Sequence, residues 1–167
     1  MAVGRLRRSD RAMSDRDSLA LLERALVGRI GTIGDDGTPY VVPLNFVCED
    51  QGRRIHLHLA RQRGHLASNL EFSSKVCFEV DEAGPLMATG DTGCNTSQAF
   101  ESVIGFGRAQ VVSDEGERKR IAALFLRKYI DEHMPGRMYQ PELPSLSEAS
   151  FITVEITDLT GKRRPSE

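Results

Sequence analysis

The sequence predicts a mainly β fold in a single domain: six antiparallel strands that close into a barrel, with two or three helices packed outside it. The chain has 167 residues, which is the length of one ordinary domain. Six of its segments are typical of strands, and most of them are joined by short turns. Such turns are too short for the crossovers that parallel strands need, so the sheet is expected to be largely antiparallel.

The first element is predicted to be a helix that begins at Ser14 and ends at Gly28. The Ser14 hydroxyl can cap its amino end, where Asp15 and Asp17 suit the positive end of the helix dipole. Its apolar face repeats at helical spacing and consists of Leu19, Leu22 and Leu26.

The domain is expected to span 14–162. Residues 1–13 are polar and Arg-rich and are expected to form a flexible arm. The chain becomes basic and polar again from Gly161, and residues 163–167 are expected to be a tail.

The six strands are expected at 29–33, 39–49, 55–60, 75–81, 101–112 and 150–157. Pro43 lacks the N–H that a sheet ladder needs, so the second strand should have a bulge or an edge there. A long loop is expected over 83–98, where Gly, Ser, Thr and Asn are frequent, and irregular chain over the Pro-containing 134–148.

Two further helices are predicted between the strands. A short one spans 65–72, and a longer one begins at Ser113 or Asp114. The buried face of the longer helix consists of Ile121, Leu124, Phe125 and Tyr129.

Composition excludes several classes of protein. The 22 basic and 24 acidic residues give a net charge of −2, which argues against a nucleic-acid partner bound by bulk electrostatics. The sequence has no run of eighteen apolar residues and no apolar segment behind its Arg-rich start, so we expect a cytoplasmic protein with no membrane contact. The three cysteines, Cys48, Cys77 and Cys94, are expected to be free thiols.

Histidines suggest a metal site only weakly. His56 and His58 share one face of the third strand, and His65 follows, which is a set that could hold a metal ion. Arg61 and Arg63 lie between them, and cations disfavour a divalent metal nearby. Two half-buried strand histidines are the simpler interpretation, and no metal is predicted.

Two other segments could bind a phosphorylated heterocycle. Arg61, Arg63, Gly64 and His65 open the short helix, where guanidinium, imidazole and backbone N–H groups could bind a phosphate, although a charged surface turn has the same composition. In 42–46, Pro43 leaves backbone groups without ladder partners, and these could pair with the edge of a flat ring. An ordinary edge strand would also account for that segment.

Hydrolytic and nucleotide-binding motifs are absent. The sequence contains no G-x-S-x-G, no P-loop and no G-x-G-x-x-G that opens a helix. Cys94 could be a reactive thiol, but free cysteines are usually inert. No catalytic residue is therefore predicted from motifs.

The order of segments resembles the pyridoxamine 5′-phosphate oxidase-like, flavin-binding split barrels, and within them the Nim-related, nitroimidazole-resistance branch. The matching segments are VGRIGTIGDDGTPYVVPLNFV (27–47), IHLHLARQRGHLASNL (55–70), KVCFEVDE (75–82), FESVIGFGRA (100–109) and LTGK (159–162). Each segment alone is unspecific, whereas their joint order and spacing are specific.

This resemblance implies a six-stranded Greek-key split barrel of the FMN-binding type. It also implies a homodimer with two flavins at the subunit interface. The residues implied to bind the cofactor are Val42, Pro43, Leu44 and Asn45 along the ring, His58, Leu59 and Ala60 beside it, Arg63, His65 and Asn69 at the phosphate, Ser102 and Val103 from the partner, and Lys162.

The function implied is that of a flavin-dependent oxidoreductase in which the cofactor transfers hydride or electrons. A nitroaromatic or similar small molecule would accept them, with NAD(P)H as a candidate donor. FMN is expected, FAD is the alternative, and haem is less favoured. His65 replaces the Lys of many relatives, and the Arg- and Ser-rich phosphate segment of the vitamin B6 oxidases is missing. A non-catalytic flavin- or haem-binding module is the competing hypothesis.

Overall fold

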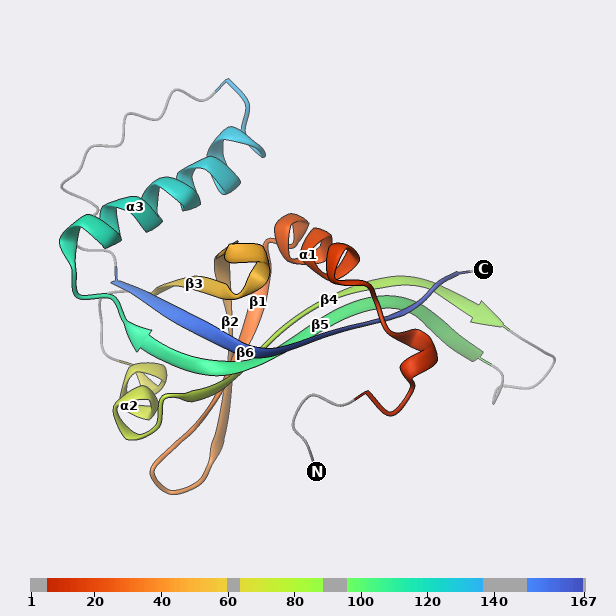
Figure 1. Cartoon of the computed structure of the whole chain (residues 1–167), viewed down its shortest axis with the longest axis horizontal. Coiled ribbons are helices and arrows are strands. Elements are labelled where there is room, and N and C mark those ends of the chain that lie inside the picture. The colour runs from red at the N-terminus through yellow and green to blue at the C-terminus, as the bar shows by residue number, and fades with distance from the viewer. Residues whose placement is uncertain (1–5, 60–63, 89–95, 137–149, 167) are drawn as a thin grey trace.

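Six strands form one closed antiparallel barrel in a computed structural model of the chain, which describes residues 6–59, 64–88, 96–136 and 150–166. The strands are β1 (Val27–Ile33), β2 (Pro39–Glu49), β3 (Arg54–Leu59), β4 (Lys75–Ala88), β5 (Thr96–Val111) and β6 (Ser150–Arg164). Around the ring they follow the order β1-β2-β3-β6-β5-β4. Figure 1 shows this arrangement, and the predicted fold class is confirmed.

Three helices lie outside the barrel: α1 (Asp15–Arg24), α2 (His65–Phe72) and α3 (Glu115–Leu126), the last continued by a π turn over Arg127–Asp131. The predicted caps of α1 and α3 are present, because Ser14 Oγ accepts the Asp17 N–H and the Asp114 carboxylate accepts the Glu117 N–H. None of the described helices is long and apolar enough to cross a bilayer.

The end of α1 was predicted incorrectly. The helix ends at Arg24 and not at Gly28, because residue 28 already belongs to β1. The bounds of α2 are those predicted.

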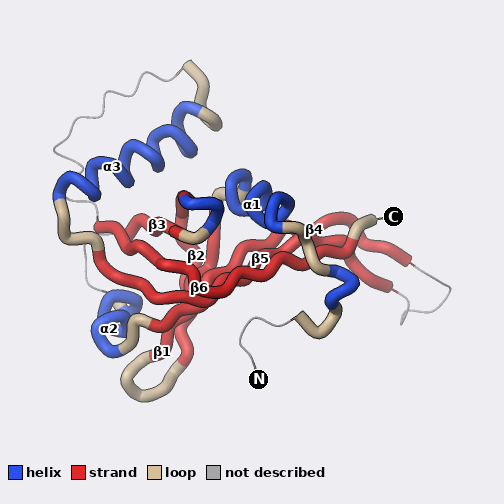
Figure 2. Tube along the Cα trace, in the orientation of Figure 1, coloured by secondary structure: helices blue, strands red, loops and turns tan. Residues whose placement is uncertain are grey.

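The β4–β5 hairpin is longer than the sequence predicts. The prediction of a loop over 83–98 is wrong at both ends of that range, since β4 continues to Ala88 and β5 begins at Thr96. Antiparallel pairing carries the strands through this polar segment, and a register shift between Ala83 and Leu86 accommodates the intervening Gly–Pro. Figure 2 shows the hairpin extending beyond the barrel, away from α2 and α3. Cys94 lies outside the described residues.

Both ends of the chain are also more ordered than expected over short stretches. β6 continues to Arg164, where it pairs with Phe100, so residues 161–164 of the basic segment, including the first two of the predicted tail, are strand. Beside it, Ala12 forms a bridge with Lys162, and the buried Met13 donates its N–H to the Gly161 carbonyl at 2.9 Å. Ladder hydrogen bonds along β6 therefore include the last residues of the predicted flexible arm.

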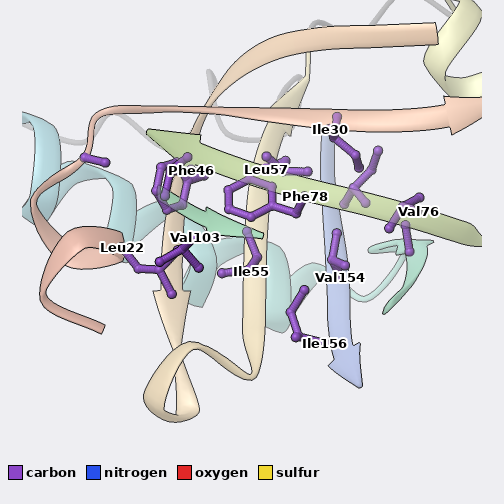
Figure 3. Close-up of a cluster of buried hydrophobic side chains, with 14 of the residues drawn as sticks. Leu22, Ile30, Phe46, Ile55, Leu57, Val76, Phe78, Val103, Val154 and Ile156 are labelled. Carbon is purple, nitrogen blue, oxygen red and sulfur yellow. The ribbon is translucent and has the colours of Figure 1, made fainter. Parts of the chain in front are cut away.

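The barrel interior is filled by alternate residues of all six strands (Figure 3). At its centre the rings of Phe46 and Phe78 meet edge to face, with centroids 5.0 Å apart. A second, smaller cluster of Ile121, Ala122 and Phe151 packs α3 onto the outside of the sheet. α3 thus covers part of the outer surface of the sheet formed by β2, β3 and β6.

Gly28 is required by this packing, which gives a first prediction. A Cβ at Gly28 would lie 2.3 Å from Phe78 Cζ, whereas a Cβ at Gly31 on the same strand would meet nothing closer than 3.6 Å. Gly28→Ala is expected to lower the free energy of unfolding by about 1–3 kcal/mol because the central aromatic pair must shift. Gly31→Ala is the control and should cost much less. Urea unfolding measures both, and equal losses would contradict this account.

Candidate functional site

Strands β2 and β3 separate at the segment expected to border a ring. β2 pairs with β1 over Pro39–Asn45 but with β3 only over Phe46–Glu49. On β3, His58 and Leu59 pair with β6 and not with β2. We call this opening the fork: the diverging ends of β2 (Val42–Asn45) and β3 (His58–Leu59).

The fork exposes one edge of β2. Phe46 directs both its N–H and its C=O toward the side of β1, where they meet Tyr129. Because backbone groups alternate along a strand, those of Val41, Pro43 and Asn45 face the opposite side, where no described residue of β3 pairs with them. The missing N–H of Pro43 therefore costs no bond in the ladder with β1, whose register runs through Pro43 without the bulge that was one of the two predicted alternatives.

His58 stands on the other side of the fork against an aromatic wall. Its ring centroid lies 5.5 Å from that of Phe151 and 6.1 Å from that of Phe125. His58 is exposed on its other side, and partial desolvation lowers its pKa below the ordinary value of 6.5. The imidazole is therefore neutral near pH 7, with a lone pair and an N–H available.

Two of the residues predicted to bind the phosphate, His65 and Asn69, lie near the β1–β2 hairpin. His65 is the exposed first residue of α2, and its ring lies 5.7 Å from that of Tyr40. Asn69 points inward instead: it is buried, and its amide donates to Thr32 Oγ1 at 3.0 Å. Asn69 thus fastens α2 to β1. Ala60, Arg61 and Arg63 lie outside the described residues.

The remaining predicted cofactor residues lie on strands β5 and β6 of the barrel. Ser102 pairs with Lys162, and the Ser102 hydroxyl is 3.5 Å from the Lys162 carbonyl. Val103 is fully buried, so its side chain belongs to the core. β5 is the strand opposite β2 in the ring, and one chain does not gather the whole predicted set at one place.

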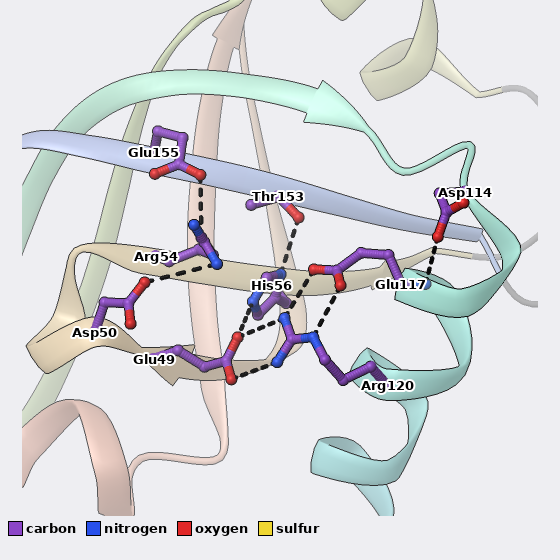
Figure 4. A network of polar contacts seen from close by, with 9 residues as sticks. All are labelled: Glu49, Asp50, Arg54, His56, Asp114, Glu117, Arg120, Thr153 and Glu155. Carbon is purple, nitrogen blue, oxygen red and sulfur yellow. Dashed lines mark hydrogen bonds and ion pairs between the residues drawn. The ribbon is translucent and has the colours of Figure 1, made fainter.

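A polar cluster occupies the outer face of the sheet under α3 (Figure 4). His56 is fully buried; Nε2 lies 2.8 Å from Glu49 and Nδ1 lies 2.9 Å from the Thr153 hydroxyl. Arg120 of α3 forms a bidentate ion pair with Glu49, at 2.6 and 2.8 Å, and also contacts Glu117. Burial lowers the pKa of His56, so the neutral ring donates to Glu49 and accepts from Thr153.

The contacts of His56 in this polar cluster bear on the metal site that the sequence suggested weakly. Both nitrogens of His56 are occupied by side chains, while His58 and His65 contact different aromatic groups. Within the described ranges, no group of three His, Cys, Asp or Glu side chains is placed to hold a metal ion.

A comparison with known protein families identifies the family of the chain. The family described as pyridoxamine 5′-phosphate oxidase matches residues 14–163. The chain belongs to this family. No curated protein sequence matches it significantly.

Solved structures with the fold of the oxidase family are similar over most of their length. A proposed 5-nitroimidazole antibiotic resistance protein of Bacteroides thetaiotaomicron is 22% identical with a TM-score of 0.73, over 91% of this chain and 86% of that one. An FAD-binding protein of Mesorhizobium loti is 23% identical with a TM-score of 0.64, over 93% and 98%. An FAD and haem binding protein of Mycobacterium smegmatis is 18% identical with a TM-score of 0.73, over 92% and 72%. At these identities the likeness establishes the split-barrel fold.

The candidate site of this oxidase-family chain is an open edge rather than an enclosed pocket. A cavity of about 440 Å³ does exist between α1, β2 and the end of α3, lined by Glu23, Val47, Cys48, Leu124, Arg127, Lys128 and Glu132. Among the described residues, its lining includes none of the predicted cofactor residues. The predicted ring-binding residues lie instead at the fork.

Sequence reasoning missed two residues at the fork, Phe125 and Tyr129. Their spacing from Ile121 correctly predicted a helix face that packs inward. The pattern contained no signal for what that face would contact, because His58 and Phe46 are distant in sequence.

Acid is expected to destabilise this fold through His56 and Glu49. The depressed pKa of His56 means that its contribution is complete above its unfolded value of 6.5 and is lost as pH falls below it. Hydrogen bonds from Arg120 lower the pKa of Glu49 from 4.5 to about 2, so its contribution disappears as pH falls from 4.5 to about 2, with an upper limit of about 3 kcal/mol.

Urea unfolding measured between about pH 7 and pH 2.5 tests this dependence. Glu49→Gln should be less stable at neutral pH and should show a shallower fall below pH 4.5. Glu155→Gln removes an exposed partner of Arg54 and should keep the wild-type slope. An unchanged slope in Glu49→Gln would refute the assignment.

Proposed function

We propose that the protein binds a flavin at the fork and is a flavin-dependent oxidoreductase. The observation that carries the proposal is the edge of β2 at the fork, which pairs with β1 but with no described residue of β3, across from a neutral His58. Family membership supports it, because the matched family is described as an oxidase, and the substrate in that description carries a phosphate.

The residues at the fork fit a flavin ring. The ring carries amide-like edges, and the carbonyls of Val41, Pro43 and Asn45, with the N–H groups of Val41 and Asn45, offer acceptors and donors along one strand edge. Leu44 and Leu59 are half-buried and could supply apolar contact to its faces. When bound, the flavin would supply hydride or electron transfer, while these residues orient it and His58 polarises the ring or a substrate.

FMN is the proposed form of the flavin. His65 is exposed at the first turn of α2, where backbone N–H groups and the helix dipole favour an anion. A single phosphate would be bound there by hydrogen bonds from the first turn of the helix and from the His65 side chain. FAD is the alternative, and it is the cofactor of the Mesorhizobium loti neighbour.

A homodimer is part of this proposal. Apolar side chains are exposed on the outer face of β1, β2 and β5, namely Val27, Ile33, Val41 and Ile104. The cross-strand pairs Gly31–Val41, Gly31–Cys77 and Cys77–Phe106 make this face continuous. Burying it against a second copy would remove the apolar surface from water and bring Ser102 of one copy toward the fork of the other.

The proposed substrates are small electron acceptors such as nitroaromatic compounds, with NAD(P)H as the donor. The similarity to a proposed 5-nitroimidazole resistance protein supports this choice of acceptor. The competing function is a flavin- or haem-binding module without turnover. Its support is the neutral His58, which could ligate a haem iron, and the neighbour that binds both FAD and haem.

An absorption spectrum of the purified protein tests the cofactor directly. Flavin bands and release of free FMN on denaturation are expected, and a Soret band would identify haem instead. Steady-state oxidation of NADPH with a nitroaromatic acceptor then separates an enzyme from a binding module. Colourless protein that takes up neither FMN nor FAD would end the proposal.

The interface is tested by a charge on the outer face. Ile104→Lys places an ammonium group on this face, beside Glu79, and should convert the dimer into a monomer that loses flavin. Val111→Lys is the matched control, because Val111 is also exposed but lies near the end of β5 that pairs with β6 and not β4. Sedimentation equilibrium measures both, and a monomeric wild-type protein would refute the interface.

A further inference from the structure

The hydroxyl of Tyr129 lies where the ladder between β1 and β2 ends. The last paired residues of that ladder are Val27 and Asn45, so Leu26 and Phe46 would form the next pair. Instead, Tyr129 accepts the N–H of Phe46 at 2.9 Å and lies 2.6 Å from the carbonyl oxygen of Leu26, to which it donates. One side-chain hydroxyl therefore replaces a pair of strand hydrogen bonds.

Asn45 shares the same acceptor. Its amide donates to the Leu26 carbonyl at 3.1 Å. Burial raises the pKa of Tyr129 above its ordinary value of 10, so the hydroxyl stays protonated and can donate. The Leu26 carbonyl thus holds Tyr129 and Asn45 together, and the side chain that begins the open edge of β2 is not free to rotate.

Phe125 connects the same helix end to the other side of the fork. Its ring is nearly parallel to that of Tyr129, at 14° and 5.7 Å between centroids. It also contacts His58, 6.1 Å away, and Phe151. The stacked pair therefore spans β2 and β3 at the point where they diverge. Tyr129 lies in the π turn that follows α3, a type of turn that is frequent at functional sites.

We propose that Tyr129 is a positioning residue for the flavin: through Leu26 and Asn45 it fixes the β2 edge against which the ring binds. This inference rests on the proposed function. Without the hydroxyl, the N–H of Phe46 loses its partner and the carbonyl of Leu26 keeps only the Asn45 amide, so the edge becomes freer to move. Tyr129 does not need to touch the flavin for this effect.

Tyr129→Phe is the decisive variant because it removes the hydroxyl and keeps the ring that stacks on Phe125. We expect flavin to bind about five- to tenfold more weakly, as for one lost hydrogen bond, with a shifted visible band and midpoint potential. In the flavin-free protein, the Phe46 amide should exchange faster with solvent. Asn45→Ala should cause a similar loss, and the double variant should lose no more than the worse single variant.

Lys128→Met is the matched control for general loosening of this helix end. Lys128 donates to the Leu22 carbonyl at 3.3 Å and lies over the Phe46 ring, so its loss should lower Tm. It should leave the visible band and the potential of bound flavin unchanged.

The outcomes separate this inference from the proposed function. If the wild-type protein binds no flavin, both are overturned. If it binds flavin and Tyr129→Phe changes neither affinity nor band nor potential, the positioning role alone is wrong. Additive losses in the double variant, or a Lys128→Met protein with the same spectral shift, would also overturn it.

Discussion

Strand β2 has two partners in succession, and the candidate site depends on that exchange. Over Pro39–Asn45 it pairs with β1, and over Phe46–Glu49 it pairs with β3 instead. A strand that gains its second neighbour partway leaves polar backbone groups on one edge before that point, and such groups need water, a side chain or a ligand. The fold therefore leaves an edge of β2 at the fork that the described residues of β3 do not pair with.

The two strands are held apart by contacts on both sides of the fork. β3 stays with β6 through Leu59, because its pairing register continues unbroken from Arg54. On β2, Pro43 cannot donate to a new strand along the open edge, which also protects that edge from non-specific pairing. Phe125 and Phe151 fill the space beside His58.

The features that the sequence predicted correctly are those that depend on a few neighbouring residues. The α2 bounds and the caps at Ser14 and Asp114 follow from propensity and capping. The hairpin beyond Ala83 could not be predicted in this way, because ladder pairing between distant segments outweighs the weak strand propensity of Gly, Ser and Thr. For the same reason the sequence indicated that Asn69 lies on α2 but not that it turns inward to Thr32.

Helix α3 illustrates why the sequence predicted residues of the candidate site but not the contacts that position them. It contributes no residue to the predicted cofactor set, yet it is fastened to the sheet at both ends by different interactions. Near its start, Arg120 binds Glu49, which in turn binds the buried His56. At its end, Tyr129 binds the backbone of β2. Because Glu49 and Phe46 belong to the same strand, the helix acts as a brace along β2, and the fork lies just beyond its last attachment.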